Sequence, residues 1–305
     1  MSSRQALSIE SRFREKTIEL LGLSPPFPTK ERVILAVSGG SDSMALLHLA
    51  YRCGLFYTEN LVVAHFDHAL RDTSDKDAVF VEKSAINLAL PFVKESWKSA
   101  TGQDSPHPAL QASGNLHEKA RTARYDFLIR TAQDYRSKWI LTGHQSDDQA
   151  ETVLHRLIRG SGLQGLAAIR PTRQLTVEIN RVSPLLSCQR QVLRTWLNHH
   201  SFPWREDPSN DNQTYTRSRL RHTVIPALAT TLSMPPGTLS HTLSETARRL
   251  HDADMALEWA LDEQHDHLHI ELTDEGISAL HAPFHALPNA LASRMLVRIH
   301  RILTR

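Results

Sequence analysis

The hexapeptide SGGSDS at residues 38–43 holds the side chains of this chain best suited to bind phosphate. It follows the apolar run 33–37 and precedes the apolar stretch 44–50, which predicts a buried strand, a glycine turn and an amphipathic helix. Adjacent glycines let backbone N–H groups approach a ligand closely, and a helix N-terminus adds partial positive charge. Serine hydroxyls add further donors. The residues expected to cradle a pyrophosphate are Ser38, Gly39, Gly40, Ser41, Asp42 and Ser43.

A second polar group stands where an apolar run gives way to the predicted helix 147–159. Ser146 and Gln149 have the spacing of a capping box, which would fix the start of this helix. Residues three and four apart lie on one face of a helix. The chemically active residues spaced to share a face here are His144, Asp148 and Glu151.

Carboxylates beside a phosphate cradle suit a Mg²⁺ ion bridged to polyphosphate. Asp42 and Asp148 are therefore the candidate metal ligands. Acidic residues in a first helical turn also complement the helix dipole, and this structural explanation is the preferred one for Asp147. For Asp148 and Glu151 the functional interpretation is preferred.

Histidine and arginine side chains form three further groups. His65, Asp67, His68 and Arg71 follow an apolar run and could contact ATP or an acceptor base, or form a surface turn. A zinc site there has too few ligands. The arginines that could contact polyphosphate or an RNA backbone, rather than form solvated faces or salt-bridge ladders, are Arg121, Arg124, Arg217, Arg219 and Arg221.

Strands and helices alternate along the first part of the chain. The expected strands are 33–37, 61–66, 91–95 and 139–142, and the helices between and after them are 42–52, 74–88, 115–132 and 147–159. This alternation predicts an α/β fold, a Rossmann-like parallel sheet with helices on both faces, whose ligand lies at the carboxyl ends of the strands. Further helices are expected at 8–21, 187–200, 238–263 and 291–303, with a short strand at 268–272 and loops at 98–114 and 203–216.

Bulk composition narrows the class of protein. The 305 residues carry a formal net charge of +2 and 40% hydrophobic residues, which suits one large domain or two smaller ones. A composition shift at prolines 226, 235 and 236 predicts a boundary between residues 1–228 and a small, mainly helical C-terminal domain, 229–305. The polar N-terminus, the lack of long apolar runs and two cysteines without metal spacing, Cys53 and Cys188, predict a cytoplasmic protein with no membrane partner. The oligomeric state stays open, a homodimer included.

These segments together resemble the tRNA(Ile)-lysidine synthetase family of PP-loop ATP pyrophosphatases. The family's ordered motifs stand here as SGGSDS at 38–43, HFDHALR at 65–71, the helix 115–128 and HQSDDQAET at 144–152. They continue through 154–166, the PLL segment 184–186, WREDPSN at 204–210 and RSRLR at 217–221. Departures from the pattern occur at His117, Ser183 and Ser218.

The resemblance implies the substrates and the reaction. ATP, with Mg²⁺, would adenylate the C2 carbonyl oxygen of the wobble cytidine in the CAU anticodon of tRNA(Ile), and the ε-amine of free lysine would then displace AMP. By resemblance, Asp42 orients Mg²⁺ or the attacking group, Asp148 and Glu151 position Mg²⁺ or the lysine ammonium, and His144 and Arg121 stabilise phosphoryl charge. His65 lines the nucleotide site. The tRNA contacts are expected from Arg124, Arg217, Arg219, Arg221 and the C-terminal domain.

Two other functions remain open at this point. Another PP-loop tRNA enzyme, such as a tRNA pyrimidine thiolation enzyme, would need catalytic cysteines, which Cys53 and Cys188 do not resemble in spacing. A non-catalytic ATP-binding module would not need the acidic residues Asp148 and Glu151.

Overall fold

The computed structural model describes residues 3–68, 74–97, 115–206, 216–235, 237–265, 271–273, 276–278 and 286–303. Its main strands are β1 (Val33–Ala36), β2 (Leu61–Asp67), β3 (Phe92–Ser96), β4 (Trp139–Thr142), β5 (Thr172–Gln174) and β6 (Asn180–Val182). The helices of the same region are α1 (Ser3–Leu21), α2 (Ser41–Arg52), α3 (Ser74–Asn87), α6 (Asn115–Asp134), α7 (Ser146–Ile158) and α9 (Arg190–His199). They are followed by α10 (Thr216–Arg219), η3 (Leu220–Val224), α11 (Ile225–Thr231) and α12 (Thr238–His265).

Six strands form one sheet in the order β3-β2-β1-β4-β6-β5. All neighbouring pairs are parallel except β5 with β6, which is antiparallel. The chain moves outward from β1 through β2 to β3 and then returns to add β4 on the other side of β1. The switch point of the sheet therefore lies between β1 and β4, where ligands of such folds bind at the carboxyl ends of the strands.

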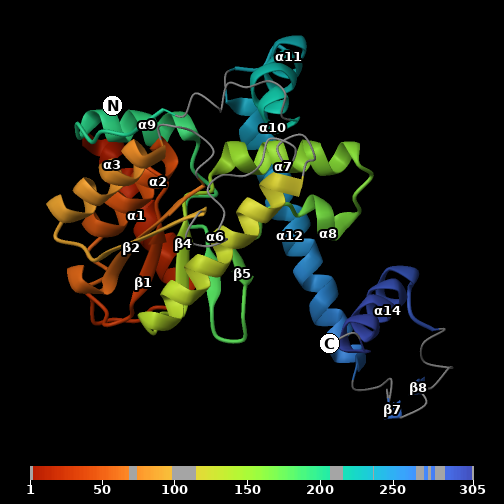
Figure 1. The fold of residues 1–305 in the computed structure, drawn as a ribbon. Helices are drawn as coiled ribbons and strands as arrows, with labels where there is room; N and C mark the ends of the chain where they lie inside the picture. The colour runs from red at the N-terminus through yellow and green to blue at the C-terminus, as the bar shows by residue number, and fades with distance from the viewer. Residues whose placement is uncertain are drawn as a thin grey trace. The chain divides into compact units, whose positions relative to one another are not determined.

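Helices cover both faces of this sheet (Figure 1). Side chains alternate along β1, so Val33 and Leu35 pack into the core formed with α1, α2, α3 and α9, whereas Ile34 packs on the opposite face with α6. The first core contains Trp196 of α9 and the second contains Phe127 of α6. The predicted fold class, a parallel sheet with helices on both faces, is confirmed.

Two strands of the main sheet are absent from the sequence-based prediction. β5 and β6 have three residues each, and β6 includes Arg181, so neither has the apolar run that marks a buried strand. Arg181 is nevertheless buried, and its Nη2 donates to the carbonyl of Arg170 at 2.6 Å. The predicted loop 98–114 lies outside the described residues, as does most of the irregular segment 203–216.

The chain divides into two compact units. The first comprises Met1–His155 and Ile169–Ser244, and the second comprises Arg156–Ala168 and Glu245–Arg305. The second contains α8 (Leu163–Leu166), the end of α12, the hairpin of β7 (Glu271–Thr273) with β8 (Gly276–Ser278), and α14 (Asn289–Leu303). Leu261 and Met295 form its buried core, and the buried carboxylate of Asp254 pairs with Arg294. The functional boundary at residue 228 stays a prediction. None of the described helices is long and apolar enough to cross a bilayer.

Candidate functional site

Two loops meet at the switch point of the sheet. One follows β1 and carries the SGGSDS hexapeptide, and the other follows β4 and leads into α7. Gly143 makes their close approach possible, because a Cβ atom there would lie 2.8 Å from the carbonyl oxygen of Asp42 and 3.1 Å from the backbone nitrogen of Ser43. The sequence thus brings its two candidate chemical segments into backbone contact.

Ser43 holds the hexapeptide loop in shape. Its Oγ accepts from the backbone N–H groups of Ser38 at 3.2 Å and Gly39 at 3.1 Å, and donates to the carbonyl of Gly40 at 2.9 Å. Gly39 has φ +94°, a conformation that side chains disfavour. The loop then enters α2, whose first backbone N–H groups have no helical acceptor. These backbone groups remain to bind an anion, whereas the hydroxyl of Ser38 lies 3.2 Å from Ser43 Oγ and that of Ser41 donates to Asp42 Oδ1 at 3.3 Å.

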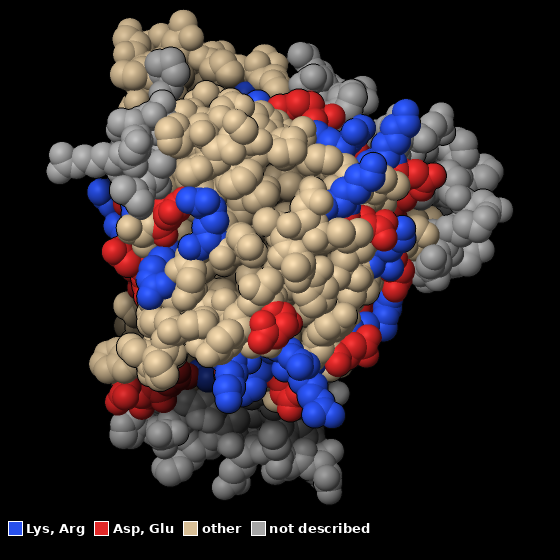
Figure 2. Space-filling view, turned by 90° about the vertical axis from the view of Figure 1, so that its left-hand side faces the viewer, with Lys and Arg blue, Asp and Glu red and all other residues tan. Residues whose placement is uncertain are grey.

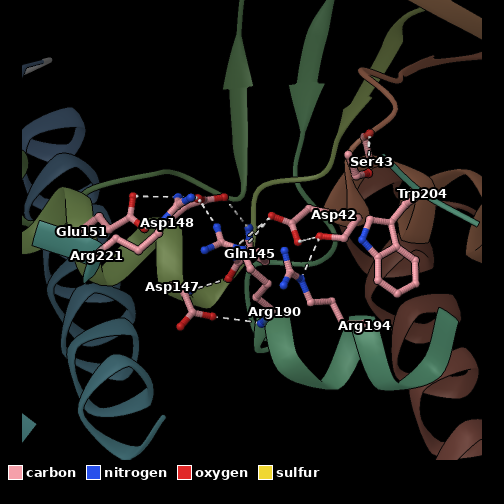
Figure 3. A network of polar contacts seen from close by, with 12 residues as sticks. Asp42, Ser43, Gln145, Asp147, Asp148, Glu151, Arg190, Arg194, Trp204 and Arg221 are labelled. Atoms are coloured by element: carbon pink, nitrogen blue, oxygen red, sulfur yellow. Dashed lines mark hydrogen bonds and ion pairs between the residues drawn. The ribbon is translucent and has the colours of Figure 1, made fainter. Parts of the chain in front are cut away.

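Arg190 joins the loop to the acidic residues of α7 (Figure 3). Its Nε donates to Asp42 Oδ2 at 3.2 Å, and its Nη2 donates to Asp148 Oδ1 at 3.2 Å. Its backbone N–H donates to Asp147 Oδ2 at 2.9 Å, so Asp147 fixes the start of α9. Asp42 and Asp148, which were predicted to hold a metal, therefore share one guanidinium.

Arg221 neutralises the other end of the acidic group. Its Nε donates to Glu151 Oε1 at 2.6 Å, and its Nη2 lies 3.4 Å from Asp148 Oδ1. Glu151 is 2% exposed. Burial raises the pKa of Asp148 to about 6, and the negative charges of Glu151 and Asp42 act in the same direction, against Arg190 and Arg221. The sequence predicted Arg221 as a tRNA contact, and in the structure it is an ion-pair partner of these carboxylates.

The predicted capping box at Ser146 and Gln149 is wrong. Gln145 and Asp148 form the reciprocal pair at the start of α7. The side-chain oxygen of Gln145 accepts from the backbone N–H of Asp147, and the backbone N–H of Gln145 donates to Asp148 Oδ2 at 3.2 Å. Gln149 instead forms two hydrogen bonds with the backbone of Ile169. The capping pair is therefore displaced by one residue, from Ser146 and Gln149 to Gln145 and Asp148, because the side-chain oxygen of Gln145 can accept a hydrogen bond as a serine hydroxyl does. Ser146 Oγ is buried with no hydrogen-bond partner among the described residues.

His144 does not join the carboxylates in a hydrogen bond. It precedes α7, and its Nδ1 lies 2.8 Å from Thr142 Oγ1 and 3.3 Å from Ser183 Oγ. Burial lowers the pKa of His144 well below its ordinary value, and the positive charges of nearby arginines lower it further. The neutral imidazole can donate one N–H to an anion but brings no charge.

The nearby arginines form a basic group with no carboxylate at ion-pair distance in the described part of the chain. Arg121 and Arg124 lie over the ring of Tyr125, with Cζ to centroid distances of 5.1 and 5.3 Å. Burial lowers the pKa of Arg124 and of Arg181. Arg217 is close enough to affect His144 electrostatically. Such a group attracts an anionic ligand.

His65 has a structural position. It is 3% exposed, and its Nδ1 lies 2.9 Å from the carbonyl oxygen of Val37, directly before the hexapeptide. Burial lowers its pKa, so the neutral ring donates to Val37 and supports the loop from β2. Among the residues that the structure describes, no group of three or more His, Cys, Asp or Glu residues is suited to hold a metal ion.

Exposed arginines lie on α10, which begins at Thr216. Arg217 and Arg219 are exposed on α10, whereas Arg221 is partly buried. On the face of the molecule drawn in Figure 2, basic and acidic side chains alternate around a central area of uncharged residues. That face has no broad basic surface.

Sequence reasoning missed Arg190, Arg181 and Gln145. Arg190 had only a weak signal, because a cation in the first turn of a helix is unfavourable against the helix dipole unless carboxylates lie nearby. Arg181 had none, since it belongs to a strand too short to predict. The capping role of Gln145 was not predicted, because the neighbouring Ser146 is a more common capping residue.

The parallel sheet, the anion-binding hexapeptide after β1 and the switch-point geometry define a nucleotide-binding α/β protein. The chain belongs to the PP-loop family: the family model described as "PP-loop domain" matches residues 9–228. Membership in this family of ATP pyrophosphatases implies that the nucleotide is ATP.

Relatives and one solved structure agree with this assignment. The chain is 37% identical over 274 residues to the tRNA(Ile)-lysidine synthase of Ruegeria pomeroyi, covering 88% of this chain and 60% of that protein. It is 36% identical to the enzyme of the same name from Geobacter sulfurreducens, covering 82% of this chain and 50% of that protein. The chain thus spans about half the length of these curated relatives. The U34-tRNA thiolase of Methanococcus maripaludis shares the fold, with TM-score 0.59 at 15% identity over 79% of this chain and 78% of that chain.

Proposed function

We propose that this protein is a tRNA(Ile)-lysidine synthetase, which uses ATP to join free lysine to C2 of the wobble cytidine in the CAU anticodon of tRNA(Ile). One observation carries the proposal. Arg190 connects Asp42 of the PP-loop to Asp148, which shares Arg221 with Glu151. A phosphate-binding loop and an acidic site suited to an ammonium are therefore contiguous, as a reaction between an adenylate and an amine requires.

The PP-loop would bind the polyphosphate of ATP. The helix N-terminus and the hydroxyls of Ser38 and Ser41 would stabilise charge that develops on the leaving pyrophosphate. Asp42 and Asp148 lie on either side of Arg190, and their carboxylates provide the hard oxygen donors that Mg²⁺ prefers. These two carboxylates would hold the metal that enters with ATP. Mg²⁺ supplies neutralisation of the pyrophosphate charge.

The wobble cytidine would reach the site as an unstacked base of the anticodon loop. Its C2 carbonyl oxygen attacks the α-phosphorus, the bond to the β-phosphate breaks, and the oxygen becomes a good leaving group. Arg121, Arg124 and Arg217, beside the neutral His144, support this step because they offer uncompensated positive charge to an RNA backbone or to the α-phosphate. Arg219 would contact tRNA from the exposed side of α10.

Free lysine would bind beside Glu151. A cavity of about 350 Å³ opens there within the first unit, with a charged end at Asp147, Glu151 and Arg221. The apolar side chains that line it suit an aliphatic stem, and they belong to Ile225, Pro226, Ala229, Met234 and Leu239. The ε-ammonium would first lose a proton to solvent, and the neutral amine would then attack C2. The bond between C2 and the oxygen of AMP breaks, AMP leaves, and the second proton of the nitrogen passes to solvent or to Asp148.

The alternative of a tRNA thiolation enzyme is not favoured. The two cysteines of the chain, Cys53 and Cys188, are both buried. Burial raises the pKa of Cys53 to about 11 and also raises the pKa of Cys188, so neither is a reactive thiolate near neutral pH. A tRNA substrate also agrees with the expected cytoplasmic location.

The test is mass analysis of nucleosides from an isoleucine tRNA transcript with a CAU anticodon, incubated with the protein, ATP, Mg²⁺ and lysine. We expect a lysine-sized mass gain on one cytidine that requires both ATP and lysine. Cleavage of ATP without this gain would retain the PP-loop chemistry and exclude this acceptor. If no acceptor promotes ATP cleavage, the non-catalytic binding module is the correct interpretation.

A further inference from the structure

Arg194 reaches the PP-loop from α9. It stands one helical turn after Arg190, and its Nε donates to Ser41 Oγ at 3.3 Å. Figure 3 shows both arginines directed from α9 toward the start of α2. Ser41 is a residue of the PP-loop, and its hydroxyl donates to Asp42 Oδ1 while it accepts from Arg194, so the guanidinium of Arg194 already lies at the edge of this loop.

The two arginines differ in how strongly they are held. Arg190 is shared between Asp42 and Asp148, and its side chain is 17% exposed. Arg194 has its ion pair with Glu206 at 3.0 Å, where the side chains are 35% and 62% exposed. An exposed ion pair contributes little to stability, whereas a guanidinium binds phosphate oxygens with strong, charge-assisted hydrogen bonds. Arg194 can therefore leave its carboxylate at small cost when a phosphate is present.

The segment that carries Glu206 is fixed to the loop by other contacts. The backbone N–H of Arg205 donates to the carbonyl of Gly39 at 3.0 Å, and the side chain of Arg205 pairs with Asp77 of α3. Trp204 Nε1 donates to Glu206 Oε1 at 2.9 Å. The loss of the Arg194 contact therefore leaves Glu206 in place, next to the indole of Trp204, with its charge no longer compensated.

We propose that Arg194 is a further polyphosphate-binding residue, which exchanges Glu206 for phosphate oxygens when the PP-loop is occupied. Glu206 keeps the guanidinium beside Ser41 while the loop is empty. Because Trp204 donates a hydrogen bond to Glu206, the exchange changes the electrostatic environment of its indole ring. This inference rests on the proposed function only in that a pyrophosphate group occupies the PP-loop.

Calorimetric titration of the full chain with inorganic pyrophosphate tests the exchange. Arg194→Gln removes the phosphate contact and should weaken binding about tenfold, the usual size for a charged hydrogen bond. Glu206→Gln removes the competing carboxylate and should tighten binding about two- to fivefold. The control is Arg52→Gln, because Arg52, whose side chain is 39% exposed, pairs with Glu10 away from the loop, and its loss should leave affinity unchanged.

The opposite directions of the two effects separate ligand contact from a structural role. If Arg194→Gln binds pyrophosphate as the native protein does, or if Glu206→Gln weakens binding as well, the exchange is refuted. Lysidine formation is measured separately on the native protein. Its failure, with the pyrophosphate effects intact, would contradict the proposed reaction and leave the role of Arg194 standing.

Tryptophan emission gives a second, independent readout. Pyrophosphate should change the emission of the native protein, and Trp204→Phe should abolish the change. Trp259→Phe is the control, since Trp259 is 67% exposed in the second unit and should not affect the response. If the emission change persists in Trp204→Phe, it arises at another tryptophan, and the exchange of Glu206 beside this indole is contradicted.

Discussion

Replacement of Gly143 by alanine should damage the PP-loop with a small change in side-chain volume. The added Cβ would lie 2.8 Å from the carbonyl oxygen and 3.0 Å from the carbonyl carbon of Asp42. Ordinary contact begins near 3.4 Å, so the backbones after β1 and β4 must separate by about 3.4 − 2.8 = 0.6 Å. Backbone atoms cannot rotate away as a side chain can, and we expect a loss of about 1–3 kcal/mol in the free energy of unfolding.

The same displacement should slow the chemistry more than it weakens nucleotide binding. A misplacement near 1 Å costs roughly 100-fold in rate, so about 0.6 Å should lower the rate of pyrophosphate release by about tenfold or more. Urea denaturation and a pyrophosphate-release assay measure the two effects. Gly162→Ala is the matched control, because Gly162 has φ −75° and a Cβ atom added there would have no heavy atom within 4 Å. Native stability and native rate in Gly143→Ala would refute the argument from close backbone approach.

Three further predictions concern charged or titratable groups. Burial raises the pKa of Asp148 to about 6, so Mg²⁺ binding should displace a proton and weaken as the pH falls below about 6, and calorimetric titration with Mg²⁺ should show that Asp148→Asn lacks this pH dependence. The pKa of His48, stacked on Phe202, is lowered to about 4 by burial, so the unfolded state binds more protons between pH 6.5 and 4. This group alone should lower the free energy of unfolding by about 3 kcal/mol over that window, while the raised pKa of Asp148 acts in the opposite direction. Urea denaturation should therefore measure the His48 contribution as the difference in pH dependence between the native protein and His48→Phe. Arg221→Gln leaves the buried Glu151 unpaired and should cost about 3 kcal/mol, partly restored by adding Glu151→Gln in a double-mutant cycle.

The sequence was sufficient for the parallel core of the fold. Long apolar strands and the glycine turn after the first of them carry strong local signals, so β1 to β4 and the PP-loop were predicted. The hairpin of β5 and β6 was not, since three-residue polar strands are fixed by pairing with the sheet edge and not by their own pattern. The fold, once known, places the loops after β1 and β4 together.

The candidate site was predictable in its acids and less so in its arginines. Asp148 and Glu151 stand in one local motif, and their spacing indicates a shared face. Arg190 comes from a helix about forty residues further along the chain, and its partners are set by tertiary packing. Arg221 was found by composition, but its pairing with Glu151 depends on the position of η3 beside α7 and could not be read locally.

The single guanidinium between Asp42 and Asp148 makes the two halves of the site thermodynamically dependent on each other. A ligand that draws Arg190 toward bound phosphate releases negative charge at Asp148, and a cation at Asp148 releases Arg190 toward the loop. Because coupling free energies are reciprocal, ATP and an ammonium-bearing substrate must each raise the affinity for the other by the same factor. Each ligand is then held more tightly once the other is bound, whichever of the two binds first.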